Sequence, residues 1–219
     1  MQHADTWAPI AAAVGERYPV RVVDFRSSTF HDRIGEIRGD GRVVVGYSMG
    51  GRLALHAALE SAFAGLVVVG ASAGIDDADE RRRRREADEE LADWIEAHPI
   101  DQVVARWERN PVFASQSASL VASQRAGRLE HSPAELARLL RSAGQGALDP
   151  VWDRLGSLSM PVLALAGEND STYRAAAERI ASLAPRGRSG VIPGAGHAAH
   201  LEAPDAVCDA IFAWLTTLE

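Results

Sequence analysis

The sequence is poor in several features that would assign it to a special class of protein. Its 219 residues include one cysteine, Cys208, so an internal disulfide is excluded and a helix position near the core is expected. It has no run of about 18 apolar residues that could span a bilayer. Its first ten residues also lack the basic and apolar regions of a signal peptide. We therefore expect a cytoplasmic protein with no membrane partner.

Positive charge is also scarce, because 23 Lys and Arg stand against 30 Asp and Glu, giving a net charge of −7. This balance disfavours nucleic acid as a partner. The seven histidines are scattered and form neither an H-x-x-x-H helix nor a cluster with cysteine, so we expect no metal site and no cofactor. The 47% hydrophobic and 24% charged residues are typical of a soluble globular protein, with length enough for one α/β domain and an insertion.

Short apolar runs rich in β-branched residues recur along the chain and predict strands. They occupy residues 20–25, 43–47, 66–70, 161–167 and 189–194. Strands of this kind, alternating with amphipathic helices, indicate an α/β fold with a mostly parallel sheet and helices on both faces. We assign residues 1–73 and 147–219 to this core.

The interval 74–146 has no strand signal and begins with a helix of dense mixed charge. Pairs such as Glu80 with Arg84 and Arg85 with Glu89 have i,i+4 spacing, which favours a solvated helix face. An all-helical insertion after a core strand lies above the carboxyl ends of the strands, where open α/β sheets bind ligands. We therefore expect residues 74–146 to form a helical lid.

The stretch "VVVGYSMGGRLAL" places Ser48 where a buried strand turns into an apolar helix. Gly46 and Gly50, two residues on either side, are expected to relieve crowding at a sharp turn because they lack a Cβ. This G-x-S-x-G pattern between strand and helix resembles the nucleophile elbow of α/β hydrolases. The alternative is a glycine-rich connection in which Ser48 only caps the helix.

An activated serine needs a base within hydrogen-bond reach and an acid that orients the base. In α/β hydrolases the chain order is serine, acid, histidine, each at the carboxyl end of a strand. After the fourth predicted strand the sequence offers Asp170, with Glu168 as a competitor nearer the strand. After the fifth it offers His197, while His200 is assigned a structural role. We take Ser48, Asp170 and His197 as the candidate catalytic set.

With these residues in view, the chain resembles one family, the 2-succinyl-6-hydroxy-2,4-cyclohexadiene-1-carboxylate synthases of menaquinone biosynthesis. The matching stretches are "GYSMGGRLALHAAL", the arginine-rich start of the lid, "WERNPVFASQ", "GENDSTY" and "PGAGHAAHLEAP", and they cover the chain from about residue 3 to its end. The resemblance implies an α/β-hydrolase fold with lyase chemistry. His197, oriented by Asp170, would activate Ser48 to remove a proton, and pyruvate would leave by elimination without an acyl-enzyme.

The resemblance also implies a small anionic substrate and therefore cations directed into the site. Arg52 matches the carboxylate-binding arginine of the family. Arg84 aligns with its lid arginine, although the run of arginines 81–85 leaves the register open. Arg125 or Arg128 would supply a further cation, and we assign Arg125 with Arg128 as the alternative.

Three further residues are expected to bind or border the substrate. Trp107 matches a lid tryptophan that lines the pocket, with a buried structural use as the alternative. Tyr47, which precedes the serine, is expected to border the site. Met49, just after the serine, would supply one backbone N–H of an oxyanion hole.

The chain departs from the family at its beginning. Family members carry a strand ending in an H-G-F-type turn before the tryptophan that Trp7 matches, and no such turn occurs in this sequence. That turn supplies the second oxyanion donor, and the loss of one such donor costs about 10²–10³ in rate. We therefore expect Met1 to be an internal methionine of a longer natural chain. The alternatives to the lyase are a carboxylester-type hydrolase that forms an acyl-enzyme and an inactive remnant.

Overall fold

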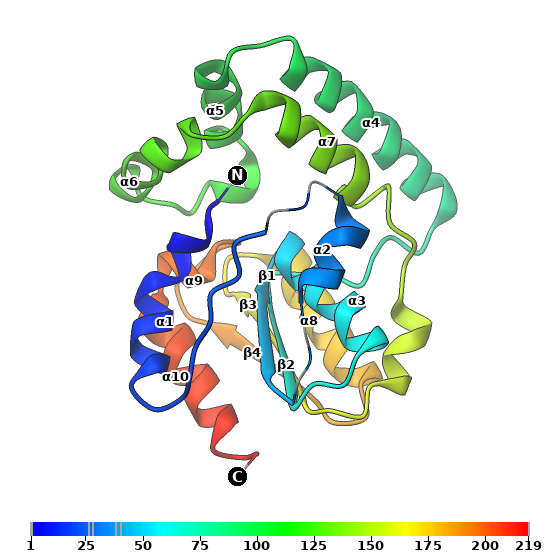
Figure 1. The fold of residues 1–219 in the computed structure, drawn as a ribbon, viewed down its shortest axis with the longest axis vertical. Coiled ribbons are helices and arrows are strands. Elements are labelled where there is room, and N and C mark those ends of the chain that lie inside the picture. The colour runs from blue at the N-terminus through cyan, green and yellow to red at the C-terminus, as the bar shows by residue number, and fades with distance from the viewer. Residues whose placement is uncertain (1, 26, 28, 38, 40, 219) are drawn as a thin grey trace.

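A parallel four-stranded sheet forms the centre of the computed structural model, which describes residues 2–25, 27, 29–37, 39 and 41–218 (Figure 1). Its strands lie in the order β1 (Val43–Tyr47), β2 (Gly65–Val69), β3 (Val162–Gly167) and β4 (Gly187–Ile192). In the register, Val45 lies opposite Val67, and Val67 opposite Leu163. The predicted α/β class and four of the five predicted strands are confirmed, each within two residues of the expected bounds.

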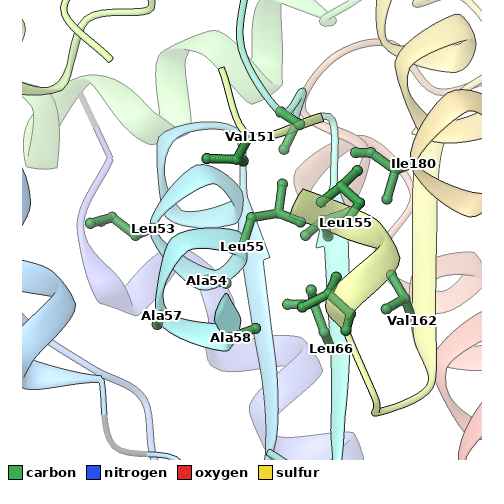
Figure 2. Packing of buried hydrophobic residues seen from close by; sticks show 14 of the residues in the cluster. Leu53, Ala54, Leu55, Ala57, Ala58, Leu66, Val151, Leu155, Val162 and Ile180 are labelled. Carbon is green, nitrogen blue, oxygen red and sulfur yellow. The ribbon is translucent and has the colours of Figure 1, made fainter. Parts of the chain in front are cut away.

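One face of the sheet is covered by α2 (Phe30–Glu36), α3 (Met49–Glu60), η3 (Trp152–Ser157) and α8 (Ser171–Leu183). Because side chains alternate along a strand, Leu66 and Val68 of β2 point into this layer. Figure 2 shows Leu55 of α3, Leu155 of η3 and Ile180 of α8 packed over this face of the sheet. Gly46 and the turn after β1 are thereby held against a rigid core.

The opposite face is covered by η1 (Ala4–Trp7), α1 (Ala8–Gly15), α9 (Ala199–Glu202) and α10 (Pro204–Leu215). Val67 and Val69 of β2 meet Ile211 and Trp214 of α10 in this layer. Cys208 lies buried on α10, as the sequence predicts.

The strand predicted at residues 20–25 is wrong. These residues form no strand, and Val20 and Val22 are 44% and 41% exposed. A β-branched run needs a neighbouring strand to supply its hydrogen bonds, and β1 pairs only with β2 among the residues described. In consequence β1 is an edge strand, and its Val45 is 38% exposed.

Between β2 and η3 the chain forms α4 (Ala78–Glu96), α5 (Ile100–Glu108), η2 (Pro111–Phe113), α6 (Ala118–Leu129) and α7 (Pro133–Ala143). These helices arch over one end of the sheet, with the first residues of the chain running beneath them (Figure 1). Ala92 and Ile95 of α4 pack on Ala137 of α7 in a separate apolar cluster. We call α4 to α7 the lid helices.

The charges of α4 are distributed differently from the expected pairs. Arg84 pairs with Asp88 at 2.8 Å instead of with Glu80. Glu89 pairs with Arg141 of α7 at 3.1 Å, and Arg141 also binds two further carboxylates of α4. Three carboxylates of α4 therefore form ion pairs with the Arg141 guanidinium of α7, and these ion pairs connect the two helices. Among the described residues, none of the helices combines the length and the hydropathy that a membrane span requires.

Candidate functional site

The turn between β1 and α3 holds Ser48 in a strained backbone conformation. Its φ of 49° is the only positive value of a non-glycine residue in the described ranges. A Cβ on Gly46 would lie 2.3 Å from the carbonyl oxygen of Gly50, and one on Gly51 would lie 2.6 Å from the Cβ of Ala71. A Cβ on Gly50 itself would meet no heavy atom within 4 Å other than those of its chain neighbours and the nearby backbone of α3. The expectation that Gly50 relieves crowding is therefore wrong. Gly51 is the residue that packs closely, against Ala71 just after β2.

The structure brings Ser48, His197 and Asp170 together from three different strand ends. The His197 Nδ1 lies 2.8 Å from the Asp170 Oδ2, and its Nε2 lies 3.1 Å from the Ser48 Oγ. A carboxylate can only accept, so Nδ1–H donates to Asp170 and Nε2 is left to accept from the serine hydroxyl. His197 and Asp170 are only 5% and 8% exposed. This arrangement can take a proton from Ser48.

Neighbouring groups fix the acid and the base. Asp170 caps α8, where its Oδ1 accepts from the Tyr173 N–H at 3.4 Å. The Tyr173 ring lies 4.5 Å from the His197 ring, and its hydroxyl accepts from the Gln145 side chain at 2.6 Å. The competing carboxylate of Glu168 accepts from the Gly194 N–H at 2.8 Å and is exposed. Glu168 is therefore engaged outside the set.

Beside the set, the half-buried Tyr47 and Trp7 form an aromatic layer with the buried His200. The His200 ring lies 4.3 Å from Tyr47 and 4.7 Å from Trp7, and the residue is 1% exposed. Burial lowers the pKa of His200 to about 3 and raises the pKa of Tyr47 well above its usual value, so both are neutral. Neither the Tyr47 hydroxyl nor the His200 ring nitrogens have a partner among the described residues. The Tyr47 ring also lies 5.2 Å from His197, so Tyr47 borders the site.

Arg52 is buried on the first turn of α3, where a cation is disfavoured by the helix dipole. Its Nη2 donates to the Ala143 carbonyl at the end of α7, 2.7 Å away, and its Nε has no partner within the described ranges. Burial lowers the pKa of Arg52 from its ordinary value. Arg84 lies on α4, where its side chain is 44% exposed and pairs with Asp88.

The two arginines of α6 have different environments. Both pair with Glu108 of α5. The Arg125 side chain is 43% exposed, whereas that of Arg128 is 2% exposed. The Nε and Nη2 of Arg128 are buried and have no partner in the described part of the chain. Of the two, Arg128 is the one held in the interior with unused donors.

A cavity of about 110 Å³ lies between the first residues of the chain and α6. Its lining is almost wholly polar and comprises Gln2, His3, Asp5, Thr6, Ser123, Gln124, Gly127 and Arg128. Asp5 and Thr6 of this lining belong to η1, which also carries the Trp7 that stacks on His200. A larger open cavity of about 390 Å³, lined by Trp152, Arg179 and four neighbours, includes none of Ser48, Asp170 and His197.

Trp107 and Met49 belong to different elements, the lid helix α5 and the core helix α3. The Trp107 ring, on α5, packs on Phe113 at 5.3 Å, and Phe113 lies 6.1 Å from His197. The Trp107 indole N–H is buried without a partner among the residues described. Met49 is the first residue of α3, so its N–H is one of the donors that a helix start leaves without an intrahelical acceptor. No group of three or more His, Cys, Asp or Glu in the described ranges is arranged to hold a metal ion.

Sequence reasoning missed three residues that lie around His197: Phe113, Tyr173 and Glu202. Tyr173 and Phe113 are brought to His197 by tertiary packing, which no local spacing reveals. Glu202 accepts hydrogen bonds from the backbone on both sides of His197. Its only sequence signal is its position five residues after His197.

Comparison with known proteins identifies the family. The model of the alpha/beta hydrolase family matches residues 2–210. A putative 2-succinyl-6-hydroxy-2,4-cyclohexadiene-1-carboxylate synthase of Bacillus subtilis is 30% identical over 99% of this chain and 78% of its own length. A synthase of the same name from Salmonella heidelberg is 35% identical over 77% of this chain, and the match spans 66% of that relative.

Solved structures agree with the sequence comparison. MenH from S. aureus superposes with a TM-score of 0.89 at 25% identity, over 99% of this chain and 90% of that one. A thermophilic esterase from Thermogutta terrifontis, at 21% identity, covers 99% of this chain and 86% of that one with a TM-score of 0.76, which shows the shared fold alone. The chain belongs to the α/β hydrolase family and, within it, to the family of 2-succinyl-6-hydroxy-2,4-cyclohexadiene-1-carboxylate synthases.

Proposed function

We propose that this chain eliminates pyruvate from 2-succinyl-5-enolpyruvyl-6-hydroxy-3-cyclohexene-1-carboxylate to give 2-succinyl-6-hydroxy-2,4-cyclohexadiene-1-carboxylate. The observation that carries the proposal is the hydrogen-bonded set Ser48, His197 and Asp170. It is accompanied by Arg52 of α3 and Arg128 of the lid helix α6, which keep buried N–H groups without a partner in the described part of the chain. Family membership supplies the substrate class, and the side chains supply a route for the proton.

The reaction begins with loss of a proton from a ring carbon of the substrate. Ser48 accepts this proton as its own hydroxyl proton passes to His197 Nε2, 3.1 Å away. Asp170 stabilises the resulting imidazolium through the 2.8 Å bond to Nδ1. The electron pair left on C2 forms the C2=C3 bond, the pair of the ring C3=C4 bond moves to C4=C5, and the C5–O bond to the enolpyruvyl group breaks. The departing enolpyruvate takes up a proton and becomes pyruvate.

The carboxylates of the substrate require cationic partners in a site shielded from water. Buried polar groups without partners are rare in native structures, so unused N–H groups indicate a missing acceptor. Arg52 and Arg128 have such groups, and the forked guanidinium is well suited to a carboxylate. We propose these two arginines as substrate-binding cations. Arg125 and Arg84 are the more exposed, and neither has a buried N–H group without a partner among the described residues.

Negative charge develops on the substrate as the proton leaves. The N–H of Met49 lies at the start of α3, where the helix dipole favours negative charge. We propose that Met49 donates to that charge. Trp107 and Tyr47 would complete the apolar wall, with the Trp107 indole N–H as a further donor.

A carboxylester-type hydrolase is the second candidate. It is favoured by the same 3.1 Å contact, because a Ser48 Oγ placed to lose its proton to His197 can also attack an ester carbonyl. The two reactions differ in whether Ser48 becomes acylated.

The experiment follows pyruvate release from the enolpyruvyl substrate by the wild-type chain, Ser48→Ala and the control Ser182→Ala, which changes an exposed serine of α8. Ser48→Ala should lower kcat by about 10³-fold or more, since the residues of such a set act as a unit. Ser182→Ala should match wild type.

Hydrolysis of a chromogenic ester and covalent labelling of Ser48 by a fluorophosphonate are measured on the same three proteins. Pyruvate release that depends on Ser48, without an accumulating acyl-enzyme, supports the lyase. Ester hydrolysis with no pyruvate release would replace it with the hydrolase. A folded chain that is inert in both assays would contradict both activities and leave the inactive remnant.

A further inference from the structure

Glu202 holds the backbone on both sides of His197. It is the last residue of α9, and its Oε1 accepts from the Ala198 N–H at 3.0 Å. Its Oε2 accepts from the Gly196 N–H at 2.8 Å. The N–H groups of the two residues that flank the histidine are therefore bound to one carboxylate.

These bonds restrict the direction in which the His197 side chain leaves the backbone. The segment between β4 and α9 has no strand neighbour at this point, so its N–H groups need another acceptor. A carboxylate accepts several hydrogen bonds, and those to a charged acceptor are stronger than neutral ones. Fixing the peptides at 196 and 198 fixes the His197 Cα–Cβ direction, and with it the two ring contacts to Asp170 and Ser48.

The same carboxylate also binds the lid. The Ser115 hydroxyl, in the segment between η2 and α6, donates to the Glu202 Oε2 at 2.7 Å. The approach is close, because a Cβ on Gly196 would lie 1.9 Å from the Ser115 Oγ. Phe113, two residues before Ser115, lies 6.1 Å from the His197 ring. One side chain thus joins the lid to the loop that carries the base.

We propose that Glu202 is a positioning residue that sets the geometry of His197 and couples it to the lid through Ser115. The part of this inference that concerns turnover rests on the proposed lyase function. The part that concerns the histidine geometry does not, because the hydrogen bonds of His197 exist in the free protein.

The test compares Glu202→Gln with the control Glu178→Gln, which changes an exposed glutamate of α8. Glutamine keeps the size of the side chain but replaces one acceptor oxygen with an NH₂ group, which repels the N–H donor facing it. A misplacement of the base of about 1 Å costs on the order of 10²-fold in rate, so kcat should fall about 10- to 100-fold. KM should change less than about twofold, because Glu202 is not placed against the substrate.

A second readout needs no substrate. The exchange with water of the His197 Nδ1 proton, which donates to Asp170, is measured by NMR on the folded proteins. Glu202→Gln should exchange this proton several-fold faster than wild type, and Glu178→Gln should not. If wild type releases no pyruvate, the proposed function fails, yet this measurement still decides the positioning role.

Glu202→Asp and Ser115→Ala keep the test decisive if glutamine prevents folding. Aspartate keeps the charge but is one methylene too short to reach both flanking peptides and Ser115, so it should show the same two losses. Ser115→Ala removes only the lid bond and should speed proton exchange less than either Glu202 variant. A folded Glu202 variant that equals wild type in both kcat and proton exchange would overturn the proposal. A loss confined to thermal stability would overturn it as well.

Discussion

Ser48, His197 and Asp170 are hydrogen-bonded to one another. In contrast, Arg52 and Arg128 keep buried N–H groups with no partner in the described ranges. The first group is complete without a ligand, since each donor meets an acceptor within the protein. The second is incomplete, and an unpartnered buried donor costs about 1–3 kcal/mol. We infer from this difference that the groups proposed to move the proton are preorganised, and that a bound anion would satisfy the unused donors of Arg52 and Arg128.

The largest effect should come from replacing Asp170, the acid of the hydrogen-bonded set Ser48, His197 and Asp170. Asp170→Asn replaces the only carboxylate that binds Nδ1, so kcat for pyruvate release should fall about 10³–10⁴-fold, as when an amide replaces the orienting acid of a Ser-His-Asp set. Glu168→Gln is the matched control, because Glu168 binds the Gly194 N–H instead, and its kcat should stay near wild type. Equal losses in the two variants would contradict the assignment of the acid.

The proposed role of a buried arginine in substrate binding is tested by comparing Arg128 with Arg125, the two arginines of α6. Arg128→Met should raise KM for the anionic substrate about 10- to 100-fold, because bonds to charged groups contribute about 1.5–3 kcal/mol. Arg125→Met should change KM less than about threefold, since that side chain is 43% exposed and such ion pairs are weak. Steady-state kinetics decide between them, with urea unfolding to separate a loss of folding. A larger KM effect at Arg125 would return the assignment to that residue.

The position of Ser48 in the hydrogen-bonded set also depends on the turn between β1 and α3. Gly46→Ala should lower the free energy of unfolding by about 1–3 kcal/mol, because its Cβ would lie 2.3 Å from a backbone oxygen. Gly50→Ala should be neutral or stabilising by up to about 1 kcal/mol, since its surroundings are open and alanine favours a helix. Urea unfolding of both variants measures the difference. Two equally destabilised proteins would show that the open space at Gly50 has been misjudged.

The smallest effect concerns His200, whose ring nitrogens also lack partners in the described part of the chain. Its pKa is lowered by burial to about 3, so below its ordinary value of 6.5 the unfolded chain binds a proton that the folded chain does not. Stability should therefore fall as pH drops from about 6.5 toward 3, by at most about 1.4 kcal/mol per pH unit from this residue.

His200→Phe should reduce the slope of unfolding free energy between pH 7.5 and 5 by this contribution. His131, whose pKa is lowered to about 4, keeps its own contribution in the variant. The exposed His31→Phe serves as control and should leave the slope unchanged. If His200→Phe and His31→Phe gave the same slope as wild type, His200 would not be the neutral buried group described here.

Local pattern was enough to predict the turn at Ser48 and the strands that meet in the centre of the sheet. The positions of Asp170 and His197 followed from chain order, because parallel strands bring their carboxyl ends to one edge. The run at residues 20–25 has the composition of a strand, but strand formation depends on a partner that composition does not reveal. Arg125 and Arg128 could not be separated either, because their burial depends on how α6 packs against residues near the start of the chain.

At Ser48 the backbone conformation that lowers stability is occupied by the side chain on which the proposed activity depends. A side chain in that conformation costs on the order of 1–3 kcal/mol, and a glycine there would remove the cost together with the hydroxyl. A laboratory selection for heat resistance alone would therefore favour Ser48→Gly among its early gains. Such a selection should be screened for turnover in every round, because Ser48→Gly also removes the hydroxyl proposed to accept the substrate proton.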